Sequence, residues 1–164
     1  MLTLRNWNLS DAESFFQYAN NPKIFLNMTD SFPHTMDEVK KVIEILSNPD
    51  EKCQCCRAID SNGEAVGCAA IFLKDDVYCK SAEIAYWLGE PFWGKGVMSH
   101  AVQQLCETAF EQYPLARISA EPFASNIGSR KVLEHAGFTL EGIKKKSVYK
   151  NGEFFDSCIY ALIK

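Results

Sequence analysis

The sequence has no long uninterrupted hydrophobic segment and no excess of positive charge. Its longest nearly apolar stretch, Ala65 to Leu73, is far shorter than the roughly 20 residues that a membrane-spanning helix needs. The N-terminus has no basic region followed by an apolar run, so we expect no signal peptide. The 17 Lys and Arg against 21 Asp and Glu leave a net charge of −4, unlike the basic surface of most nucleic-acid-binding proteins. We therefore expect neither membrane nor nucleic acid as a partner.

A paired-cysteine framework and a metal-binding pattern are also missing. The seven cysteines are odd in number, and several stand in apolar patterns, where free cysteine behaves as a small hydrophobic residue. Cys53 and Cys56 have C-x-x-C spacing, but no second such pair and no spaced histidine pair completes a zinc site. We expect a cytoplasmic protein with reduced cysteines and no metal.

The pattern of apolar residues over 164 positions predicts one α/β domain covering residues 1–164. Helices are predicted from Asp11 to Ala19, after Thr35, from Val97 and from Asn126, with a loop between Asn20 and Pro33. Strands are predicted at 2–7, 55–59, 65–73, 82–88, 117–121, 138–150 and 154–163. Asn-Gly pairs at 62–63 and 151–152 favour hairpins. Because a helix connects strands 82–88 and 117–121, these two should be parallel, in a mixed sheet of about seven strands with about four helices.

The loop before the helix at Val97 contains Gly94 and Gly96, whose backbones can take positive φ and approach a ligand closely. The first N–H groups of a helix have no partner within it, and the helix dipole favours an anion at that end. Strand, glycine loop and helix N-terminus together predict a phosphate site for a pyrophosphate-bearing cofactor. The alternative is a tight turn without ligand, which a Gly-x-Gly often forms.

Several short motifs follow one another in a defined order and spacing. They are Ala82-Glu83-Ile84-Ala85-Tyr86-Trp87-Leu88, the loop Trp93-Gly94-Lys95-Gly96, the N-x-x-S run from Asn126 to Ser129, Val132-Leu133, Gly137-Phe138, Glu141-Gly142 and the closing Asn151-Gly152-Glu153. In this order they resemble the RimJ/RimL-type branch of the GNAT acetyltransferases, over essentially the whole chain. The resemblance implies an N-acetyltransferase that moves the acetyl group of acetyl-CoA to a primary amine by direct attack. The acceptor would be a protein N-terminus or a small amine, and the protein a monomer or homodimer.

The resemblance also implies a cofactor site between two parallel strands that splay apart in a mostly antiparallel sheet. The pantetheine arm would lie between strands 82–88 and 117–121, and the pyrophosphate on backbone N–H groups of the glycine loop. Asn126 would contact the cofactor, although asparagine is equally a good N-cap. The residues implied for cofactor binding are Trp87, Leu88, Trp93, Gly94, Lys95, Gly96, Val97, Met98, Ser99 and Asn126.

Two residues are candidates for catalysis. Glu83 is the candidate base, because an apolar setting beside Ala85 and Trp87 would raise its pKa; the alternative is a structural carboxylate that pairs with a lysine or arginine. Ser129 is the candidate for protonating the CoA thiolate, or else a serine that only stands in the first helical turn.

The sequence departs from the family pattern at three positions. Pro91 stands three residues before the first glycine of the loop, where the general GNAT pattern has Gln or Arg. The glutamate proposed as base in RimL-like enzymes is replaced by Val148, and a tyrosine common on the last helix is replaced by Leu133. A catalytically silent CoA-binding module is therefore the alternative function, and turnover distinguishes the two. Trp7, Phe32 and Tyr149 are further candidates for the acceptor pocket. The run Lys144 to Lys146 either attracts an acidic group or is a solvated face.

Overall fold

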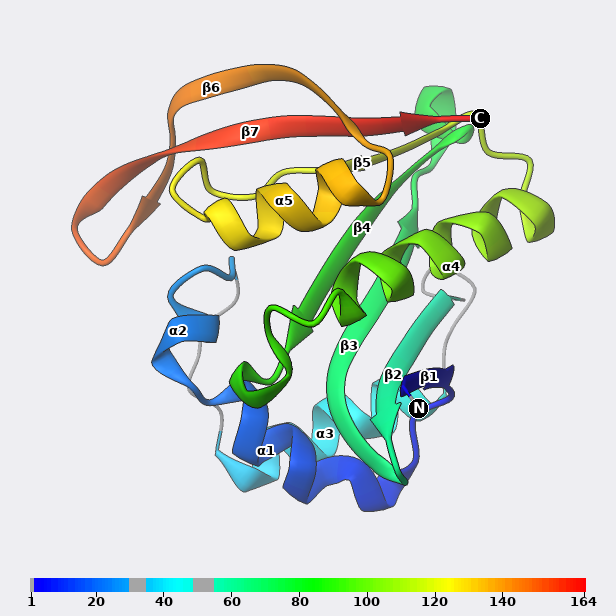
Figure 1. Cartoon of the computed structure of the whole chain (residues 1–164), viewed down its shortest axis with the longest axis vertical. Coiled ribbons are helices and arrows are strands. Elements are labelled where there is room, and N and C mark those ends of the chain that lie inside the picture. The colour runs from blue at the N-terminus through cyan, green and yellow to red at the C-terminus, as the bar shows by residue number, and fades with distance from the viewer. Residues whose placement is uncertain (1, 30–34, 49–54) are drawn as a thin grey trace.

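The computed structural model describes residues 2–29, 35–48 and 55–164. Its centre is a seven-stranded sheet with the strand order β1-β2-β3-β4-β5-β7-β6 (Figure 1). All neighbouring strands are antiparallel except β4 and β5, so the predicted mixed sheet and its parallel pair are confirmed. The strands are β1 (Leu2–Arg5), β2 (Cys55–Ser61), β3 (Glu64–Leu73), β4 (Ser81–Leu88), β5 (Arg117–Ala120), β6 (Thr139–Lys150) and β7 (Glu153–Ile163).

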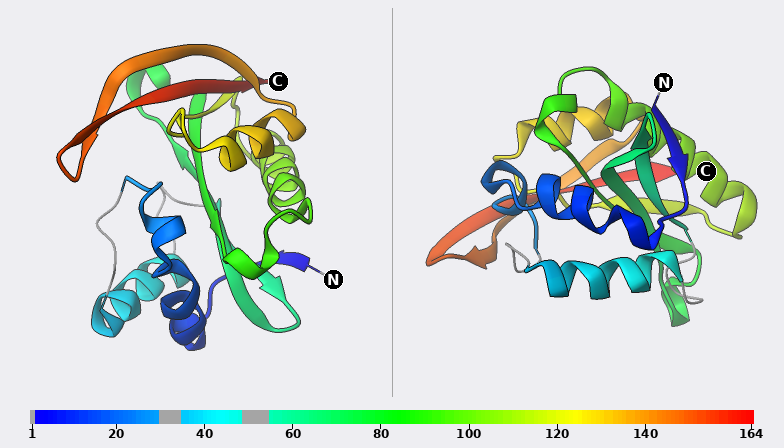
Figure 2. Two further views of the ribbon diagram at one scale, coloured as in Figure 1. Left: turned by 60° about the vertical axis from the view of Figure 1, so that its left-hand side comes forward. Right: turned by 90° about the horizontal axis from the view of Figure 1, so that it is seen from below.

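Helices cover both faces of the sheet. Figure 2 shows α1 and α3 on one face and α4 and α5 on the other. The helices are α1 (Ala12–Ala19), α2 (Pro22–Phe25), α3 (Met36–Ser47), α4 (Val97–Gln112) and α5 (Ile127–His135). Within the described ranges, none of them is long and apolar enough to cross a membrane.

The short helix α2 was not predicted, because Asn20-Asn21-Pro22 was interpreted as the end of a helix and the start of a loop. The side chain of Asn21 accepts a hydrogen bond from the Lys23 N–H and caps a new turn with Pro22 in its first position. Proline fits there because the first N–H groups of a helix are unpaired in any case. The same residues therefore end α1 and begin α2.

The core has two parts, one on each face of the sheet. On the α4 and α5 face it includes Val102, Ile118 and Leu133, and on the α1 and α3 face it includes Phe15 and Ile43. The strand β4 contributes to both parts, since successive side chains of a strand point to opposite faces. The strand is therefore held in place by packing on both of its sides.

Both predicted Asn-Gly hairpins are confirmed. Asn62 and Gly63 have φ of 56° and 93°, and Asn151 and Gly152 have φ of 53° and 84°. Two consecutive positive φ angles are what the favoured two-residue hairpin turn requires.

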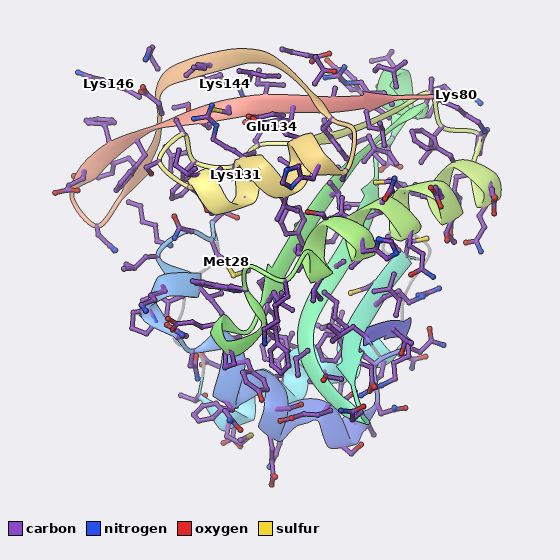
Figure 3. All side chains as sticks on the ribbon, viewed as in Figure 1. Met28, Lys80, Lys131, Glu134, Lys144 and Lys146 are labelled. Carbon is purple, nitrogen blue, oxygen red and sulfur yellow. The ribbon has the colours of Figure 1, made fainter. Side chains whose placement is uncertain are left out.

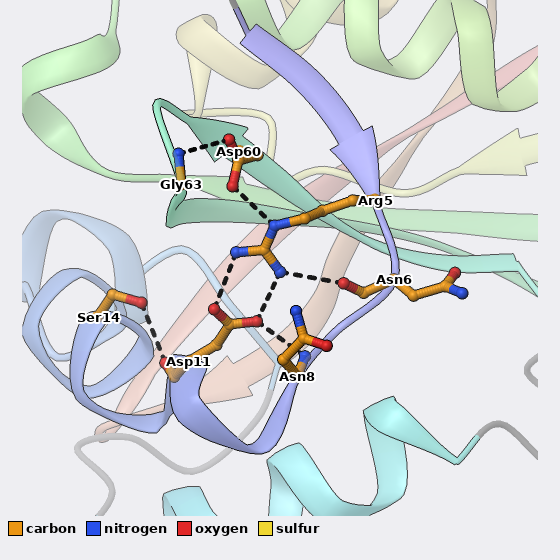
Figure 4. Close-up of polar contacts among 7 residues, drawn as sticks. All are labelled: Arg5, Asn6, Asn8, Asp11, Ser14, Asp60 and Gly63. Carbon is orange, nitrogen blue, oxygen red and sulfur yellow. Dashed lines mark hydrogen bonds and ion pairs between the residues drawn. The ribbon is translucent and has the colours of Figure 1, made fainter.

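A cluster of three charged side chains, called the ionic cluster below, ties the N-terminus to the sheet (Figure 4). Arg5 donates two hydrogen bonds to Asp11, at 2.7 and 2.9 Å, and one from Nε to Asp60 at 2.7 Å. Asp11 also accepts from the Asn8 N–H, and Asp60 from the Gly63 N–H. The bond from Arg5 is the main cause that holds the pKa of Asp60 below its ordinary value. The cluster connects β1, the start of α1 and the β2–β3 hairpin.

Candidate active site

The parallel pairing of β4 and β5 ends halfway along β4. Residues from Ser81 to Glu83 pair with β5, whereas pairing with β3 continues to Leu88. From Ile84 to Leu88 the side of β4 that faces β5 thus lies beyond the β4–β5 ladder, and the two strands diverge there (Figure 1). We call this stretch the open edge.

The open edge presents peptide groups in a strand-like row. The Gly89 N–H donates to the Val66 carbonyl at 2.8 Å, which sets the alternation of the β3–β4 ladder. The peptide groups of Trp87 and Ala85 therefore face β3, and those of Tyr86 and Leu88 face the open edge. The Leu88 carbonyl accepts a hydrogen bond from the Trp93 indole at 2.6 Å. The remaining groups suit an extended chain with amides, such as the pantetheine arm of CoA.

The glycine loop has the geometry that a phosphate group requires. Gly94 and Gly96 have φ of 73° and 72°, and a Cβ built on either one meets nothing within 4 Å. Gly96 is the N-cap of α4, and no side chain caps the helix there. A hollow of about 410 Å³ touches the loop at Lys95 to Val97, but the rest of its lining comes from β1, β2 and α4, so it lies on the side of α4 away from the open edge. The unpaired N–H groups of the first turn of α4 could hold a pyrophosphate.

The other residues implied for cofactor binding differ in exposure. The side chains of Trp87, Leu88 and Met98 are largely buried, so these residues would contact a cofactor at the open edge and the glycine loop through their backbones. Lys95 donates from Nζ to the Pro91 carbonyl, and Val97 and Ser99 are half-buried. Trp93 is 42% exposed.

Asn126 is the N-cap of α5. Its side-chain oxygen accepts a hydrogen bond from the Ser129 N–H at 3.1 Å. The N-cap interpretation of this residue is therefore confirmed, and its contact with the cofactor remains a prediction. The cap also orients the first turn of α5, which carries Ser129.

Ser129 and Tyr86 meet across the divergence of the two strands, and we call them the hydroxyl pair. Tyr86 Oη lies 2.8 Å from Ser129 Oγ and 3.1 Å from the Ser129 carbonyl oxygen. Burial raises the pKa of Tyr86, so the phenol stays protonated at neutral pH. The sequence-based prediction missed Tyr86. Strand alternation offered a signal, since it turns Tyr86 away from the face of Glu83 and toward the helix that carries Ser129.

Glu83 does not have the apolar surroundings that were expected. Its side chain is 49% exposed, and it forms an ion pair with Lys74 Nζ at 3.5 Å. It lies at the last paired position of β4 and β5, next to the open edge. Its surroundings resemble those of a structural carboxylate, and its role as a base remains a prediction.

Val148 and Leu133 are both apolar side chains in packed positions. Val148 is half-buried in β6, and Leu133 is fully buried in the core. Trp7 is buried against Phe15 instead of lining a pocket, and Tyr149 packs on Phe154 at the tip of the β6–β7 hairpin. Phe32 lies outside the described residues.

The lysine run on β6 has the partners of a solvated face. Lys144 pairs with Glu121 at 2.8 Å and Lys145 with Asp156 at 2.9 Å. Figure 3 shows Lys144 and Lys146 beside β6 and β7, away from the N-terminus of α4. This position does not bring them to the glycine loop.

The described ranges contain neither a disulfide nor a cluster of side chains placed to bind a metal. Cys53 of the C-x-x-C spacing lies outside them. Five of the six described cysteines are buried, and none of the six forms a disulfide. Among the residues that the structure describes, no group of three His, Cys, Asp or Glu side chains is placed to hold a metal ion.

Comparison with known proteins places this arrangement in a family. Residues 1–139 match the family model "Acetyltransferase (GNAT) domain". The chain is 30% identical to an uncharacterized N-acetyltransferase, p20 of Bacillus licheniformis, over 99% of this chain and 93% of that protein.

Two solved structures extend the similarity. RimL, a ribosomal L7/L12 alpha-N-protein acetyltransferase in complex with coenzyme A, has a TM-score of 0.85 at 28% identity, covering 99% of this chain and 93% of that chain. The microcin C7 self-immunity acetyltransferase MccE, in complex with acetyl-CoA and AMP, has a TM-score of 0.85 at 27% identity, covering 99% and 92%. The protein is an acetyl-CoA-dependent N-acetyltransferase of the RimJ/RimL-like branch, and it belongs to the GNAT family.

Proposed function

We propose that this protein transfers the acetyl group of acetyl-CoA directly to a primary amine, and that the hydroxyl pair protonates the departing thiolate. Bound acetyl-CoA supplies a reactive thioester and a thiol leaving group. The observation that carries the proposal is the 2.8 Å contact between Tyr86 Oη and Ser129 Oγ beside the open edge. The glycine loop and the peptide groups of the open edge support the same placement of the cofactor.

The two hydroxyls carry one hydrogen each, and the Tyr86 hydrogen has two acceptors within reach, the Ser129 carbonyl oxygen and Ser129 Oγ. When Tyr86 donates to the carbonyl, Ser129 Oγ donates to Tyr86 Oη and no hydrogen is free. When Tyr86 donates to Ser129 Oγ instead, the Ser129 hydrogen is free to be donated to a third atom, and the proposed protonation of the thiolate requires this second arrangement. Ser129 is thus the direct donor: as its O–H bond breaks it takes the Tyr86 proton, and water then restores the proton of Tyr86. This assigns to the pair the role that a tyrosine at position 133 would otherwise have.

The amine must lose a proton during the reaction. A free α-amino group has a pKa near ~8, so a useful fraction is already neutral at pH 7, whereas a lysine side chain near ~10.4 needs a base more. Glu83 stands next to the open edge and is the proposed base, and its exposure also allows water to carry the proton. The name of RimL, an alpha-N-protein acetyltransferase, supports an α-amine as the acceptor.

The test measures binding and turnover separately. Acetyl-CoA and CoA, but not ATP or NAD, should raise the melting temperature, since a ligand at ~100 times its Kd adds about 2.7 kcal/mol. Consumption of acetyl-CoA is then followed by mass spectrometry across N-terminal peptides, lysine-containing peptides with blocked N-termini, and small amines. We expect acetylated α-amines. Binding without turnover of any amine would instead support a silent CoA-binding module, and a response to ATP alone would refute both.

A further inference from the structure

A second hollow, of about 620 Å³, lies on the opposite side of β4 from α4 and α5. Its walls come from the helices α1 and α3 and the strands β2, β3 and β4. We call it the apolar hollow. It is separate from the hollow at the glycine loop, because no residue lines both.

The lining of the apolar hollow is almost entirely apolar. Phe15 and Trp87 meet edge to face at 5.1 Å between ring centroids. They are joined by side chains from α3 and from the neighbouring strands, among them Val42, Leu46 and Ala70.

The two charged side chains of the lining both belong to α3. Glu38 is already bound to the backbone N–H and the hydroxyl of Thr35, in the capping box that begins the helix. Lys41 is exposed on the same helix. The charges are therefore confined to one wall, and the strand side of the hollow offers aliphatic and aromatic surface together with the thiols of Cys56 and Cys68.

The apolar hollow reaches the open edge. Ala85 and Tyr86 line it, and Tyr86 is also the residue that contacts Ser129. Met28, which follows α2, is another lining residue, and Figure 3 shows it between α2 and β4. The Tyr86 side chain itself points to the other face, toward Ser129, so a group that enters the hollow lies across the open edge from the hydroxyl pair.

We propose that the acceptor is a primary amine whose neighbouring substituent is apolar and of aromatic or branched aliphatic size, and that this substituent occupies the apolar hollow. The inference rests on the proposed function. Burial of an apolar substituent against this lining is favourable, whereas a carboxylate or hydroxyl would lose its hydration without a compensating partner on the strand side. The same chemistry is found in a protein N-terminus with an apolar first residue and in a free arylalkyl amine.

The first experiment compares matched acceptors in the wild-type enzyme with acetyl-CoA. The tripeptides Phe-Ala-Ala, Leu-Ala-Ala, Ser-Ala-Ala and Asp-Ala-Ala form one series, and phenethylamine and ethanolamine form the other. We expect kcat/KM to be at least ~10-fold higher for the apolar member of each series, since even one methylene in an apolar pocket discriminates by roughly 10–200-fold. The series with the larger kcat/KM identifies the source of the substituent.

The second experiment changes the wall of the hollow. Val42→Asp adds a carboxylate to a half-buried lining position, and Ile45→Asp is the matched control on the same helix, at a position that is 68% exposed and outside the lining. We expect Val42→Asp to lower kcat/KM for apolar acceptors at least ~10-fold, with unchanged affinity for CoA, and Ile45→Asp to change neither. If Val42→Asp does not fold, Phe72→Asn changes the strand side of the hollow instead, because Phe72 of β3 lines the hollow and is 43% exposed.

The outcomes separate this inference from the proposed function. Two results overturn the inference and leave the proposed function standing. One is a kcat/KM for the Ser, Asp or ethanolamine acceptors that equals or exceeds that for the apolar acceptors. The other is a preference for apolar acceptors that survives in the folded wall variant. Turnover of no amine overturns the function. In that case, melting temperatures of the CoA-saturated protein still test whether the hollow binds an apolar substituent. A rise in melting temperature with phenethylamine, absent with ethanolamine and lost in the wall variant, supports the inference. No rise with phenethylamine overturns it.

Discussion

The ionic cluster and the hydroxyl pair are both polar and partly buried, yet they differ in how their hydrogen-bonding capacity is used. In the ionic cluster the two carboxylates share one guanidinium and also accept backbone N–H groups. In the hydroxyl pair two neutral groups share one short contact at the end of a strand ladder.

Under the proposed function, the difference separates the stabilising role of the ionic cluster from the chemical role of the hydroxyl pair. A cluster whose charges are paired with each other holds elements together, and the loss of one partner leaves the other uncompensated. Removing one hydroxyl of the pair should change the free energy of unfolding little, whereas it removes a proton that the proposed mechanism donates. Changes in the first region should therefore affect the free energy of unfolding, and changes around the open edge should affect binding or turnover.

The largest effect is expected from Gly96→Val at the glycine loop. A branched side chain resists the φ of 72° and fills the space proposed for the pyrophosphate, so CoA binding should be abolished while the protein stays folded. Gly152→Val is the control, since Gly152 also has positive φ with free space around it but lies in the β6–β7 turn. Calorimetric titration with CoA gives the answer. Affinity within a few-fold of wild type would mean that the phosphate site lies elsewhere.

The next largest effect concerns the hydroxyl pair. Ser129→Ala should lower kcat by roughly 10²-fold or more at every pH, because protonation of the thiolate does not depend on the ionisation of the amine. Tyr86→Phe should lower kcat less, and the double variant little more than Ser129→Ala, since the two act as a unit. CoA affinity and melting temperature should change little. Additive losses in the double variant would show that the two hydroxyls act independently.

The ionic cluster gives the opposite pattern. Asp11→Ala leaves Arg5 without its two-point partner and should lower the free energy of unfolding by roughly 2–3 kcal/mol, with kcat of the folded fraction unchanged. Urea titration measures the change, and Glu13→Ala, an exposed acidic residue of α1, is the matched control. A loss of kcat at full stability would contradict the division between the two regions.

A smaller effect is expected from Glu83→Gln. Because Glu83 is half exposed and water reaches it, we expect kcat to fall only roughly 10-fold near neutral pH, less than the 10²–10⁴-fold contribution typical of general bases. The loss should shrink as the pH approaches the pKa of the acceptor amine, where no base is needed. A pH–rate profile with one confirmed acceptor measures this. Full activity at neutral pH would assign Glu83 to its ion pair with Lys74.

The smallest effect is a change in the acid dependence of stability. The pKa of Asp60 is lowered in the folded protein, so its contribution is present above its ordinary pKa near ~3.9 and is lost as the pH falls through the lower folded value. Asp60→Asn should therefore differ from wild type less at pH 3 than at pH 6 in urea midpoint. Glu111→Gln, exposed on α4, is the control. A difference that does not depend on pH would refute the electrostatic origin.

Much of the architecture was predictable because it rests on local signals. The Asn-Gly pairs require a particular turn, the Thr35 to Glu38 capping box begins α3, and apolar periodicity identifies the amphipathic helices. The parallel relation of β4 and β5 follows from the helix between them. The one helix that was not predicted is α2. The residues Asn20-Asn21-Pro22 are typical both of the end of one helix and of the start of another, and only the first was predicted.

The site divides in the same way. The sequence by itself determined the glycine loop and the first turn of α5, because positive φ and N-capping are properties of a few consecutive residues. Only the tertiary structure decided that Tyr86 of β4 meets Ser129 of α5 and that Glu83 is exposed beside Lys74. The Tyr86–Ser129 contact joins residues 43 positions apart and depends on where the β4–β5 ladder ends, whereas the Glu83–Lys74 pair spans the connection between β3 and β4. The end of that ladder is a relation between two strands that are distant in the sequence, so no local pattern specifies it.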